Sequence, residues 1–598
     1  MVRVTMFCNV HKVVAHTPPQ SLFNPKHLLV AAIDFGTTYS SWAFSFRFDY
    51  DSDPTKVSAK QWQGHESTKG PTCVLIKPDG KTLHSFGFDA EAKYAELIEE
   101  DENKDWFFFR RFKMMLWKQK LNRNSLLEDE NGRKLLAMTV FALSIKYLKE
   151  DLWVVSNDRI ADAVLPNEIH WVLTVPAIWN NAAKQFMREA AEEAGIESDM
   201  LTIALEPEAA SLFCRHLPVE KSGDQFSLAS LRAGRQYLVL DAGGGTVDIT
   251  VHEITASGGV KELYKASGGA WGGTKVDDSF EEFLVCLTDK CVVKKFKEHH
   301  LDDYTELLRR FEVKKREIDP DMDTKLVMSI PLAFLTTVKK GLHKDFNKAV
   351  KKTSYSNSVT LSGDKLKIDA TVARSFFKES IDSTIEHVKD ILGKRENCGV
   401  EAILMVGGFS ESKMLNKAVK QTFPGLKLIV PDEAGLAILK GAVMFGHDPR
   451  GITERISKYT YGILTHPAFD STKHPESAIF TDIDGIDKCQ YFFDKHVLAG
   501  QSLRVGEAQS EETYVTRPSH TSTVLIEVFA TENKFPVLVT DPGCRQVGKY
   551  TLEMAGTGGG RPILVRMIFG GTEIDVECTE KATGNVSHIK IDFLSYIC

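Results

Sequence analysis

The chain has 598 residues, of which 43% are hydrophobic and 26% charged, the balance of a globular protein with two or three domains. Its net charge of −7 is mild for this length, so no nucleic-acid partner is expected. The ten cysteines form no CxxC pair and no run of eighteen apolar residues occurs, which argues against a zinc site, a disulfide framework and a membrane span. We therefore expect a cytoplasmic protein.

The first hydrophobic stretch of the chain is interrupted only once by small and polar residues. It reads LLVAAIDFGTTYSSWAFSF from Leu28 to Phe46, so that one apolar run ends in Asp34 and a second follows a short turn. This pattern predicts two strands joined by a tight turn. Residues 1–27, which contain three prolines, are expected to form a loose leader before it.

Helical and strand-like patterns alternate over the next segment. The expected elements are a strand at Cys73–Ile76, helices at Phe86–Leu97, Asp105–Trp117 and Leu135–Trp153, a strand at Trp171–Val175, and helices at Ala182–Ala194 and Ala209–His216. The helix at Asp105–Trp117 would bury an aromatic stripe and direct its cations to water. Asn180 or Asn181 is a suitable N-cap for the helix at Ala182–Ala194.

A second stretch repeats the strand, turn and strand pattern about two hundred residues later. It reads QYLVLDAGGGTVDITVHE from Gln236 to Glu253, with Asp241 before three glycines and Asp248 after them. Glycines leave backbone N–H groups uncovered, so such a turn can surround an anion such as phosphate. A carboxylate at the end of a strand suits a hydrated Mg²⁺ ion. An ordinary hairpin is the alternative for one such turn, but the duplication favours two phosphate-binding turns that face one cleft.

Further motifs follow in the C-terminal half. Ser267–Phe280 is a third glycine-rich turn that leads into a helix, and Leu301–Ile318 predicts a charged helix. Glu401–Phe423 predicts a strand, a turn at two glycines and a helix. From residue 459 onward, short alternating runs such as Thr523–Ala530 predict an antiparallel β-sandwich.

These motifs resemble those of a known superfamily. The turns IDFGTTYS and LDAGGGTVDI are similar to the phosphate loops of actin, hexokinase and the seventy-kilodalton heat-shock proteins. The segments VLTVPAIWNNAAKQFMREAAEEAG, ALEPEAASLF, VGGFSESKMLNKAV and VPDEAGLAILKGA resemble the connecting segments and adenosine-binding turn of the heat-shock chaperone ATPases. The sequence GGAWGGTKVDDSF is most similar to that of the divergent branch called heat shock 70 kDa protein 12.

The resemblance implies a fold and a division into domains. The fold class is α/β, with an actin-like two-lobed ATPase of duplicated ribonuclease H-like units at residues 28–447. A linker at 448–458 and an antiparallel β-sandwich at 459–598, similar to a substrate-binding domain but without a helical lid, would complete the chain. The connector lacks the short acidic leucine run of the family.

The resemblance also implies a site for ATP or ADP with Mg²⁺. Its catalytic residues would be Asp34, Glu206, Asp241, Asp248, Arg110 and Lys113, and water would link Asp34 and Asp241 to the metal. Its nucleotide-binding residues would be Gly36, Thr37, Thr38, Tyr39, Gly243, Gly244, Gly245, Thr246, Gly272, Gly273, Thr274, Glu312, Lys315, Arg316, Gly407, Gly408, Phe409 and Asp432.

Several of these positions either differ from the family or could have a purely structural role. Arg110 stands where the family has a lysine directed at the γ-phosphate, and Lys113 lies one turn further on. Glu206 precedes a proline, which favours an extended residue pointing into a cleft, but it could also serve as a first-turn carboxylate of a helix. The charges at Leu301–Ile318 could form a solvated face instead of an adenosine clamp. Glu411 or Ser412 occupies the place of an arginine that stacks on adenine in the family.

Together these features predict an atypical Hsp70-type chaperone for the stress response, which binds ATP, hydrolyses it weakly and holds protein clients through its C-terminal β-domain. Co-chaperones would be further partners. One alternative is a nucleotide-gated adaptor for signalling partners with little hydrolysis, and another is a small-molecule kinase of the sugar-kinase type. The chain has neither GxxxxGK[ST] nor GxGxxG, so the P-loop and Rossmann classes lack their defining residues.

Overall fold

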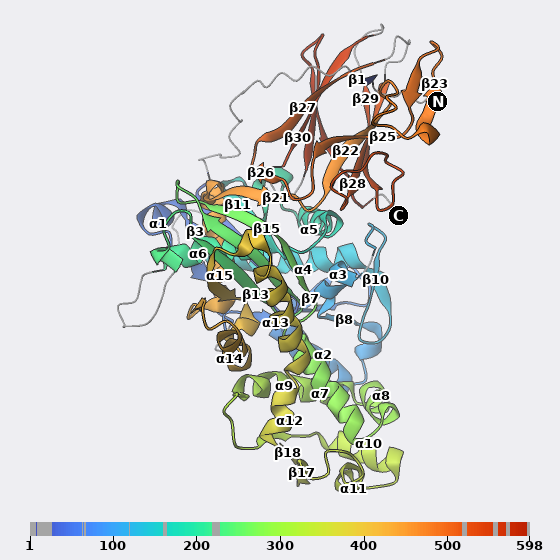
Figure 1. Ribbon diagram of the computed structural model, residues 1–598. Coiled ribbons are helices and arrows are strands. Elements are labelled where there is room, and N and C mark those ends of the chain that lie inside the picture. Colours follow the sequence, from blue (N-terminus) through green and yellow to red (C-terminus); the bar gives the residue numbers. More distant parts are fainter. Residues whose placement is uncertain are drawn as a thin grey trace.

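The protein forms two α/β lobes with a β-rich region at one end (Figure 1). The computed structural model describes residues 7–8, 27–62, 64, 67–118, 120–158, 164–217, 228–516, 523–553, 560–569 and 574–594. The predicted leader lies outside these residues, apart from residue 27 and strand β1 (Phe7–Cys8), which pairs with a strand of the β-rich region. Among the helices that the structure describes, none has the length and apolar character that crossing a membrane requires.

The first lobe is built on a mixed sheet with the strand order β12-β11-β2-β3-β4, and β5 also pairs with β3. Its strands are β2 (Leu29–Phe35), β3 (Tyr39–Phe46), β4 (Ser58–Ala59), β5 (Gly70–Pro71), β11 (Ile169–Val175) and β12 (Leu201–Leu205). β2 and β3 form the predicted hairpin, in which Asp34 lies opposite Ser41.

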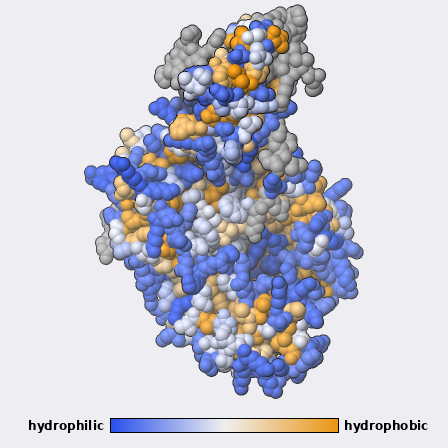
Figure 2. Space-filling model, turned by 45° about the vertical axis from the view of Figure 1, so that its right-hand side comes forward, coloured by the Kyte–Doolittle hydropathy of each residue, from blue (hydrophilic) through white to orange (hydrophobic). Residues whose placement is uncertain are grey.

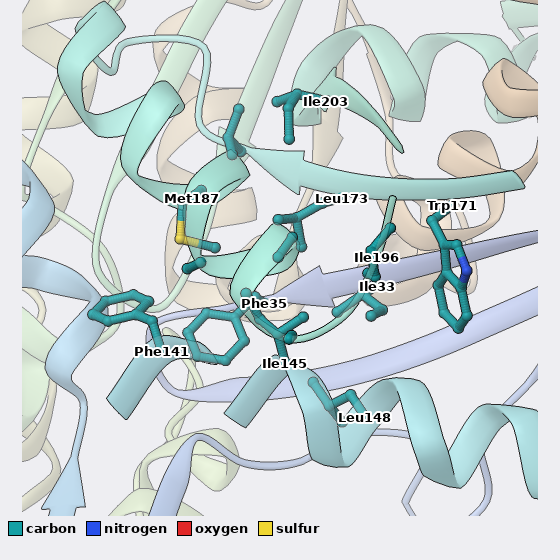
Figure 3. Packing of buried hydrophobic residues seen from close by; sticks show 14 of the residues in the cluster. Ile33, Phe35, Phe141, Ile145, Leu148, Trp171, Leu173, Met187, Ile196 and Ile203 are labelled. Atoms are coloured by element: carbon teal, nitrogen blue, oxygen red, sulfur yellow. The ribbon is translucent and has the colours of Figure 1, made fainter. Parts of the chain in front are cut away.

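Helices α4 (Ala137–Asn157) and α5 (Asn181–Glu193) supply apolar side chains to the core of this lobe. In Figure 3, Phe35, Phe141 and Met187 from three elements point toward one shared interior. The predicted N-cap is confirmed, because the Asn180 side chain accepts a hydrogen bond of 2.9 Å from the N–H of Ala183. Helix α1 (Arg47–Ser52) follows β3 directly.

A smaller sheet of the first lobe corrects one prediction. It contains β7 (Leu83–Phe86), β6 (Cys73–Ile76) and β8 (Phe107–Arg110), and it packs beside helix α2 (Phe88–Glu99). The helix expected at Asp105–Trp117 is wrong, because β8 occupies its centre and only the short α3 (Met115–Lys118) follows. Successive Phe residues favour a strand here, since Phe107 and Phe109 share one face while Phe108 packs on Tyr94 from the other. β9 (Leu126–Glu128) and β10 (Lys134–Leu136) form a separate hairpin.

The second lobe is built on a sheet with the order β20-β19-β13-β14-β15-β21-β26. Its strands are β13 (Gln236–Ala242), β14 (Val247–Ile254), β15 (Val260–Gly269), β19 (Val400–Val406), β20 (Lys427–Ile429), β21 (Ile452–Ile456) and β26 (Ser502–Arg504). β13 and β14 are the second predicted hairpin. Helix α14 (Lys413–Thr422) follows β19, as the strand, turn and helix pattern predicts.

Helices α6 (Glu206–His216) and α15 (Ala434–His447) join the two lobes at their centre. They pack closely because Gly441 has no side chain, and a Cβ at that position would lie 1.7 Å from the carbonyl oxygen of Ala209. One hydrophobic cluster draws on both helices and on β2 and β11 of the first lobe. This contact fixes the two hairpins relative to each other.

The outer part of the second lobe is mainly helical (Figure 1). Its elements are α7 (Thr274–Leu287), α8 (Lys290–His299), α9 (Leu301–Lys314), β16 (Leu326–Ser329), α10 (Leu332–Leu342), α11 (Phe346–Val350), β17 (Val359–Ser362), β18 (Lys365–Ile368), α12 (Ala370–Ser375) and α13 (Lys378–Leu392). The predicted helices after the third glycine-rich turn and at Leu301–Ile318 correspond to α7 and α9.

The C-terminal region contains two antiparallel sheets that share one hydrophobic core. One sheet has the order β25-β22-β28-β29 and the other β1-β27-β30-β31-β32. The bounds are β22 (Thr460–Thr465), β25 (Phe492–Val497), β27 (Ala508–Val515), β28 (Thr523–Thr531), β29 (Arg545–Glu553), β30 (Pro562–Ile568), β31 (Asp575–Glu580) and β32 (Val586–Lys590), with a separate hairpin of β23 (Ile479–Thr481) and β24 (Asp487–Cys489).

The segment expected to be a linker, residues 448–458, is part of the second lobe. It supplies β21, which pairs with β15 and with β26. The Arg455 guanidinium donates two hydrogen bonds, of 2.7 and 2.6 Å, to the buried carboxylate of Glu208 on α6. The C-terminal region also contacts the first lobe, because Arg123 pairs with Asp592 and Leu594 lies in the core of that lobe.

Candidate functional site

The turns of the two hairpins touch each other. A Cβ atom placed on Gly244 would lie 2.2 Å from Thr38 Oγ1, and one on Gly245 would lie 2.6 Å from Thr37 Oγ1. Only glycine allows this approach. In the described part of the chain, the N–H groups of Gly244 and Gly245 donate no backbone hydrogen bond, so they remain available to an anion.

Acidic side chains gather directly beneath these turns. Asp34 lies near the end of β2, Asp241 and Asp248 oppose each other on β13 and β14, and Glu206 is the first residue of α6. One oxygen atom from each of Glu206, Asp241 and Asp248 lies within 4.8 Å of the other two, and all three side chains are buried. Four elements from both lobes thus converge on one acidic cluster.

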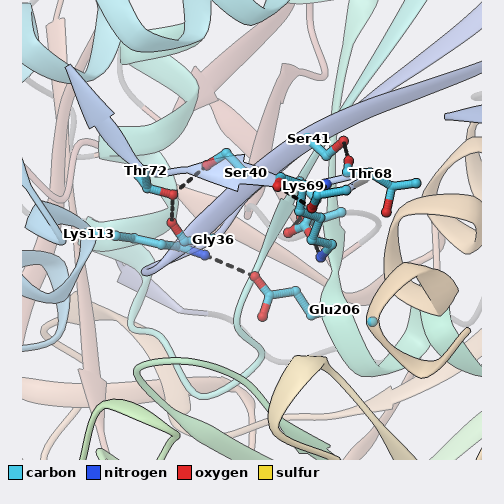
Figure 4. Close-up of polar contacts among 12 residues, drawn as sticks. Gly36, Ser40, Ser41, Thr68, Lys69, Thr72, Lys113 and Glu206 are labelled. Carbon is cyan, nitrogen blue, oxygen red and sulfur yellow. Dashed lines mark hydrogen bonds and ion pairs between the residues drawn. The ribbon is translucent and has the colours of Figure 1, made fainter. Parts of the chain in front are cut away.

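Two lysines neutralise part of this charge. Lys113 Nζ lies 3.0 Å from Glu206 Oε1 and Lys69 Nζ lies 2.6 Å from Asp34 Oδ2; Figure 4 shows both lysines with the turn at Gly36. Burial raises the pKa of Asp34, but the two ammonium groups outweigh it and hold that pKa below its usual value. Asp34 is therefore charged at neutral pH.

The other three carboxylates of the cluster, those of Asp241, Asp248 and Glu206, ionise less readily than an exposed carboxylate. Burial raises the pKa of Asp241 and of Asp248 well above the ordinary value, and neighbouring carboxylates raise it further. Neither oxygen of Asp248 accepts a hydrogen bond of normal geometry, although the N–H groups of Ala177 and Ile178 lie near enough to favour its charged form. Burial likewise raises the pKa of Glu206 more than Lys113 lowers it.

These residues fit a hydrated divalent cation. Among the described residues, one oxygen of Asp241 and both oxygens of Asp248 are buried without a hydrogen-bond partner of normal geometry, a state in which a carboxylate can accept hydrogen bonds from metal-bound water. Four carboxylates and two ammonium groups leave two excess negative charges when all are ionised, which one divalent cation would balance. Mg²⁺ is the natural choice for oxygen ligands that keep its waters.

Two sequence-based expectations about this cluster change. Arg110 does not reach it, because its guanidinium donates to Thr305 Oγ1 at 3.4 Å and faces Glu91 instead. Lys113, the second cation considered for this place, is the one that contacts Glu206. Glu206 is not extended before its proline but begins α6, so the helix start directs it to the cluster.

The third glycine-rich turn packs on the second and is not a free anion cradle. The N–H groups of Gly272, Gly273 and Thr274 donate to carbonyl oxygens of residues 243–245, at 2.8 to 3.3 Å. A Cβ on Gly272 would lie 2.5 Å from the carbonyl oxygen of Gly244. This turn therefore supports the second hairpin from behind, while Gly243 donates its own N–H to the carbonyl of Thr246.

The expected adenosine clamp forms a charged network at the edge of the site. Lys315 Nζ lies 2.6 Å from Asp277 Oδ1, and Arg111 reaches both Asp277 Oδ2, at 3.0 Å, and Glu312 Oε2, at 3.5 Å. Arg316 lies over the ring of Tyr39, 5.8 Å from its centroid. Because Arg111 and Tyr39 belong to the first lobe, this network joins the lobes across the site.

The glycine turn after β19 also borders the site. Gly407 has a φ of 85°, and a Cβ there would lie 2.5 Å from Asp241 Oδ1, so only glycine fits against this carboxylate. Phe409 is buried and stacks on Phe377. Gly408 and Asp432 are exposed, and no hydrogen bond or ion pair between described residues joins Asp432 to the cluster. In place of the family's arginine, the Glu411 carboxylate accepts a hydrogen bond from the Gly435 N–H.

The sequence analysis missed Lys69, Arg111 and Thr174. Lys69 lies in a polar segment that has no motif of its own, and Thr174 donates to Asp34 Oδ1 from within a buried strand. Arg111 has one sequence signal, its position in a run of cations. Its left-handed backbone, with a φ of 51°, is visible only in the structure and marks a strained residue at a site.

Duplicated hairpins that touch above a lysine-balanced acidic cluster are the arrangement expected of an actin-like nucleotide-binding domain. A family model described as Hsp70 protein matches residues 109–453. Heat shock 70 kDa protein 12A of Mus musculus is 34% identical over an alignment that covers 95% of this chain and 92% of that protein. Heat shock 70 kDa protein 12B of Homo sapiens is also 34% identical, over 97% of this chain and 92% of its own. The chain belongs to the Hsp70 family, in the divergent branch of proteins 12A and 12B.

More distant members match a smaller part. Chaperone protein DnaK of Thermotoga maritima is 26% identical over 322 residues, which cover 51% of this chain and 45% of that protein. Members of the Hsp70 family in general bind ATP or ADP with Mg²⁺.

Proposed function

We propose that this protein is a chaperone that binds ATP with Mg²⁺, hydrolyses it slowly and holds protein clients through its C-terminal sheets. One observation carries the proposal: the two glycine turns meet directly above the four carboxylates and the two lysines. Uncovered N–H groups suit phosphates, and the acidic cluster suits the cation that accompanies them.

Each group then has a distinct role. The N–H groups of Gly244 and Gly245 and the hydroxyls of the opposite turn hold the phosphates. Asp34 and Asp241 would hold Mg²⁺ through its waters, and the bound ion would supply positive charge to the phosphate oxygens. Lys113, with its neighbour Glu206, lies where negative charge develops during phosphoryl transfer. Asp248 orients the attacking water by accepting its hydrogen bond, since both of its oxygens are without a normal partner.

Nucleotide entry requires the lobes to move apart, because the two turns are in contact. The network of Arg111 with Asp277 and Glu312 is the polar contact that opening would break at the edge of the site. On the adenosine side, Glu312, Lys315 and Arg316 would then exchange partners with the ribose and the base. A nucleotide bound there would bridge the lobes in place of the ion pairs.

The client-binding part of the proposal rests on the C-terminal region. We assign residues 28–447 to the nucleotide-binding domain and 459–598 to a client-binding β-sandwich in a cytoplasmic protein. Large apolar side chains are exposed here, with Ile483 88% and Phe535 65% accessible, and Figure 2 shows apolar residues at the end that these sheets form. Exposed apolar surface of this kind is typical of an interaction site.

The test is calorimetry of ATP and ADP binding with and without Mg²⁺, followed by single-turnover hydrolysis by the wild type and Asp241→Asn. Binding of both nucleotides by the wild type and a hydrolysis rate that is lost in the variant are expected. Equal and negligible rates with intact binding would leave the nucleotide-gated adaptor. ADP release that depends on an added sugar would instead indicate a small-molecule kinase, and no binding of either nucleotide would refute the proposal.

A further inference from the structure

Lys69 reaches the acidic cluster from a loop that is anchored independently of its side chain. The Ser41 hydroxyl donates to the carbonyl oxygen of Thr68 at 2.5 Å, and the Ser67 hydroxyl donates to that of Lys69 at 2.7 Å (Figure 4). Gly70 follows in β5, paired with Ser40 of the first hairpin. The backbone is therefore fixed beside the first turn whether or not the ammonium group is paired.

The ammonium group of Lys69 meets a carboxylate that has no free oxygen. Asp34 Oδ2 is 2.6 Å from Lys69 Nζ, while Asp34 Oδ1 accepts a hydrogen bond of 3.1 Å from the Thr174 hydroxyl. Asp241 and Asp248 differ, because one oxygen of Asp241 and both oxygens of Asp248 are buried without such a partner among the described residues. Lys69 thus already balances the charge of Asp34 before any metal or nucleotide binds.

Lys69 also differs from the second lysine of the cluster. The Lys113 side chain is 3% exposed and lies over the Trp179 ring, whereas the Lys69 side chain is 21% exposed. Lys113 is therefore held in place by packing, and Lys69 retains room to move. A four-carbon side chain with that room can turn from a carboxylate to a phosphate that binds beside it.

We propose that Lys69 is a phosphate-binding residue that also acts as a built-in counter-ion of Asp34, so that the nucleotide is held with little dependence on a divalent cation. The inference rests on the proposed nucleotide site. When a triphosphate enters between the turns, the Lys69 ammonium group contacts a phosphate oxygen while it remains near Asp34. Removal of the metal then leaves one positive charge in place beside the phosphates.

The experiment compares ATP affinity in Mg²⁺ and in excess EDTA for the wild type, Lys69→Met and Lys69→Arg. For the wild type we expect a loss of at most about tenfold on metal removal, and for Lys69→Met a further loss of about 10- to 100-fold in EDTA, the effect of one charged hydrogen bond. Lys69→Arg retains the charge and should resemble the wild type. Lys56→Met, which removes a lysine paired with Asp49 on the surface, is the matched control.

A second measurement is the affinity for Mn²⁺ without nucleotide, which should be higher for Lys69→Met than for the wild type. Loss of the ammonium group frees Asp34 Oδ2, so Lys69→Met should bind Mn²⁺ about tenfold more tightly than the wild type. A misfolded variant would bind it more weakly. If the wild type binds ATP but Lys69→Met has the same metal dependence and the same Mn²⁺ affinity, this inference fails alone. If the wild type binds no ATP in either condition, the proposed function fails and this inference with it.

Discussion

Asp241 and Asp248 are directly opposed residues of β13 and β14, and both carboxylates are buried. Two carboxylates placed opposite each other in a buried hairpin destabilise the fold unless a cation lies between them or one holds a proton. Burial and mutual repulsion accordingly raise the pKa of Asp241, and burial together with the charge of Glu206 raises that of Asp248. The hairpin therefore loses stability when both carboxylates are charged, and a bound cation or a proton relieves that loss.

Replacement of Asp248 by Asn should separate stability from activity. Without bound metal at pH 8, we expect Asp248→Asn to raise the free energy of unfolding by about 1–3 kcal/mol, because a buried and poorly paired charge is removed. Single-turnover hydrolysis should fall about 100-fold or more, since the attacking water loses its acceptor. Urea unfolding and a rapid-quench assay measure the two effects. Asp382→Asn on the surface of α13 is the control, and a destabilised variant with an unchanged rate would contradict the assignment.

The buried pair of Lys113 and Glu206 predicts a rescue in a double variant. Lys113→Met leaves the Glu206 carboxylate buried without its partner and should lower the free energy of unfolding by about 3–5 kcal/mol. Lys113→Met combined with Glu206→Gln should recover most of that loss in urea unfolding but none of the hydrolysis rate. The exposed pair of Lys93 and Glu96 provides the control, since its removal should change stability by less than about 1 kcal/mol. An additive double variant would show that the two side chains do not interact.

Gly244 should tolerate no side chain while the lobes are closed. The Cβ of Gly244→Ala would meet Thr38 Oγ1 at 2.2 Å, so the turns must separate and ATP affinity should fall about 10- to 100-fold. Combining it with Thr38→Ala removes the nearest atom and should restore part of the affinity, as calorimetry can establish. Gly425→Ala is the control, because a Cβ at Gly425 meets nothing within 4 Å. Unaltered affinity of Gly244→Ala would exclude a nucleotide held between touching turns.

The pair of Arg455 and Glu208 should hold the connector on the second lobe. Arg455→Met leaves Glu208 buried without its bidentate partner, at an expected loss of about 3–5 kcal/mol in the free energy of unfolding. Proteolysis within residues 448–458 should become faster, because β21 detaches more readily. Arg504→Met, at an exposed pair with Glu507, should leave the cleavage rate unchanged. Equal cleavage of both variants would mean that the ion pair does not retain the connector.

Glu262 gives a pH-dependence whose sign follows from its burial. Burial raises the pKa of Glu262 to about 7, although its carboxylate accepts a hydrogen bond from the Ile456 N–H. An unfolded glutamate has a pKa of about 4.3, so the unfolded chain releases this proton first as pH rises. The contribution of Glu262 to stability is therefore complete below about pH 4 and is lost as pH rises to about 7.

Glu262→Gln should remove that dependence. The difference in unfolding free energy between variant and wild type should change by up to about 3 kcal/mol from pH 4 to pH 7.5, reduced by the partial exposure of the side chain. Thermal unfolding of both proteins across this range measures it. Parallel pH profiles would show that Glu262 titrates normally.

Much of the fold followed from local patterns. The hairpins at β2–β3 and β13–β14, the Asn180 cap of α5 and the helices after the glycine-rich turns were predicted because strand alternation, turn glycines and capping side chains act over a few neighbouring residues. The error at β8 came from the same source. A short run of apolar residues such as these three Phe residues fits a buried helix segment as well as a strand buried on both faces. Only the pairing of β8 with β6 shows that the segment is a strand.

The cations of the same segment were left undecided by the sequence. The resemblance placed Arg110 where the family has its γ-phosphate lysine, with Lys113 one turn further on, and either cation was a candidate. In the structure, Arg110 ends a strand and the left-handed Arg111 turns the chain, so that Lys113 alone points to Glu206. The direction of a long side chain depends on the backbone beneath it.

The sequence by itself determined the two glycine hairpins, the carboxylates on the strands of these hairpins and the membership of the Hsp70 family, because each of these features depends on a run of consecutive residues. Only the tertiary structure decided which cations balance those carboxylates, that the turns touch, and that the connector joins the second lobe as β21. Lys69 lies 35 positions from Asp34 in the chain, and Glu208 lies 247 positions from Arg455. Such pairs form where strand pairing and helix packing bring remote segments together, and no local pattern of residues specifies that meeting.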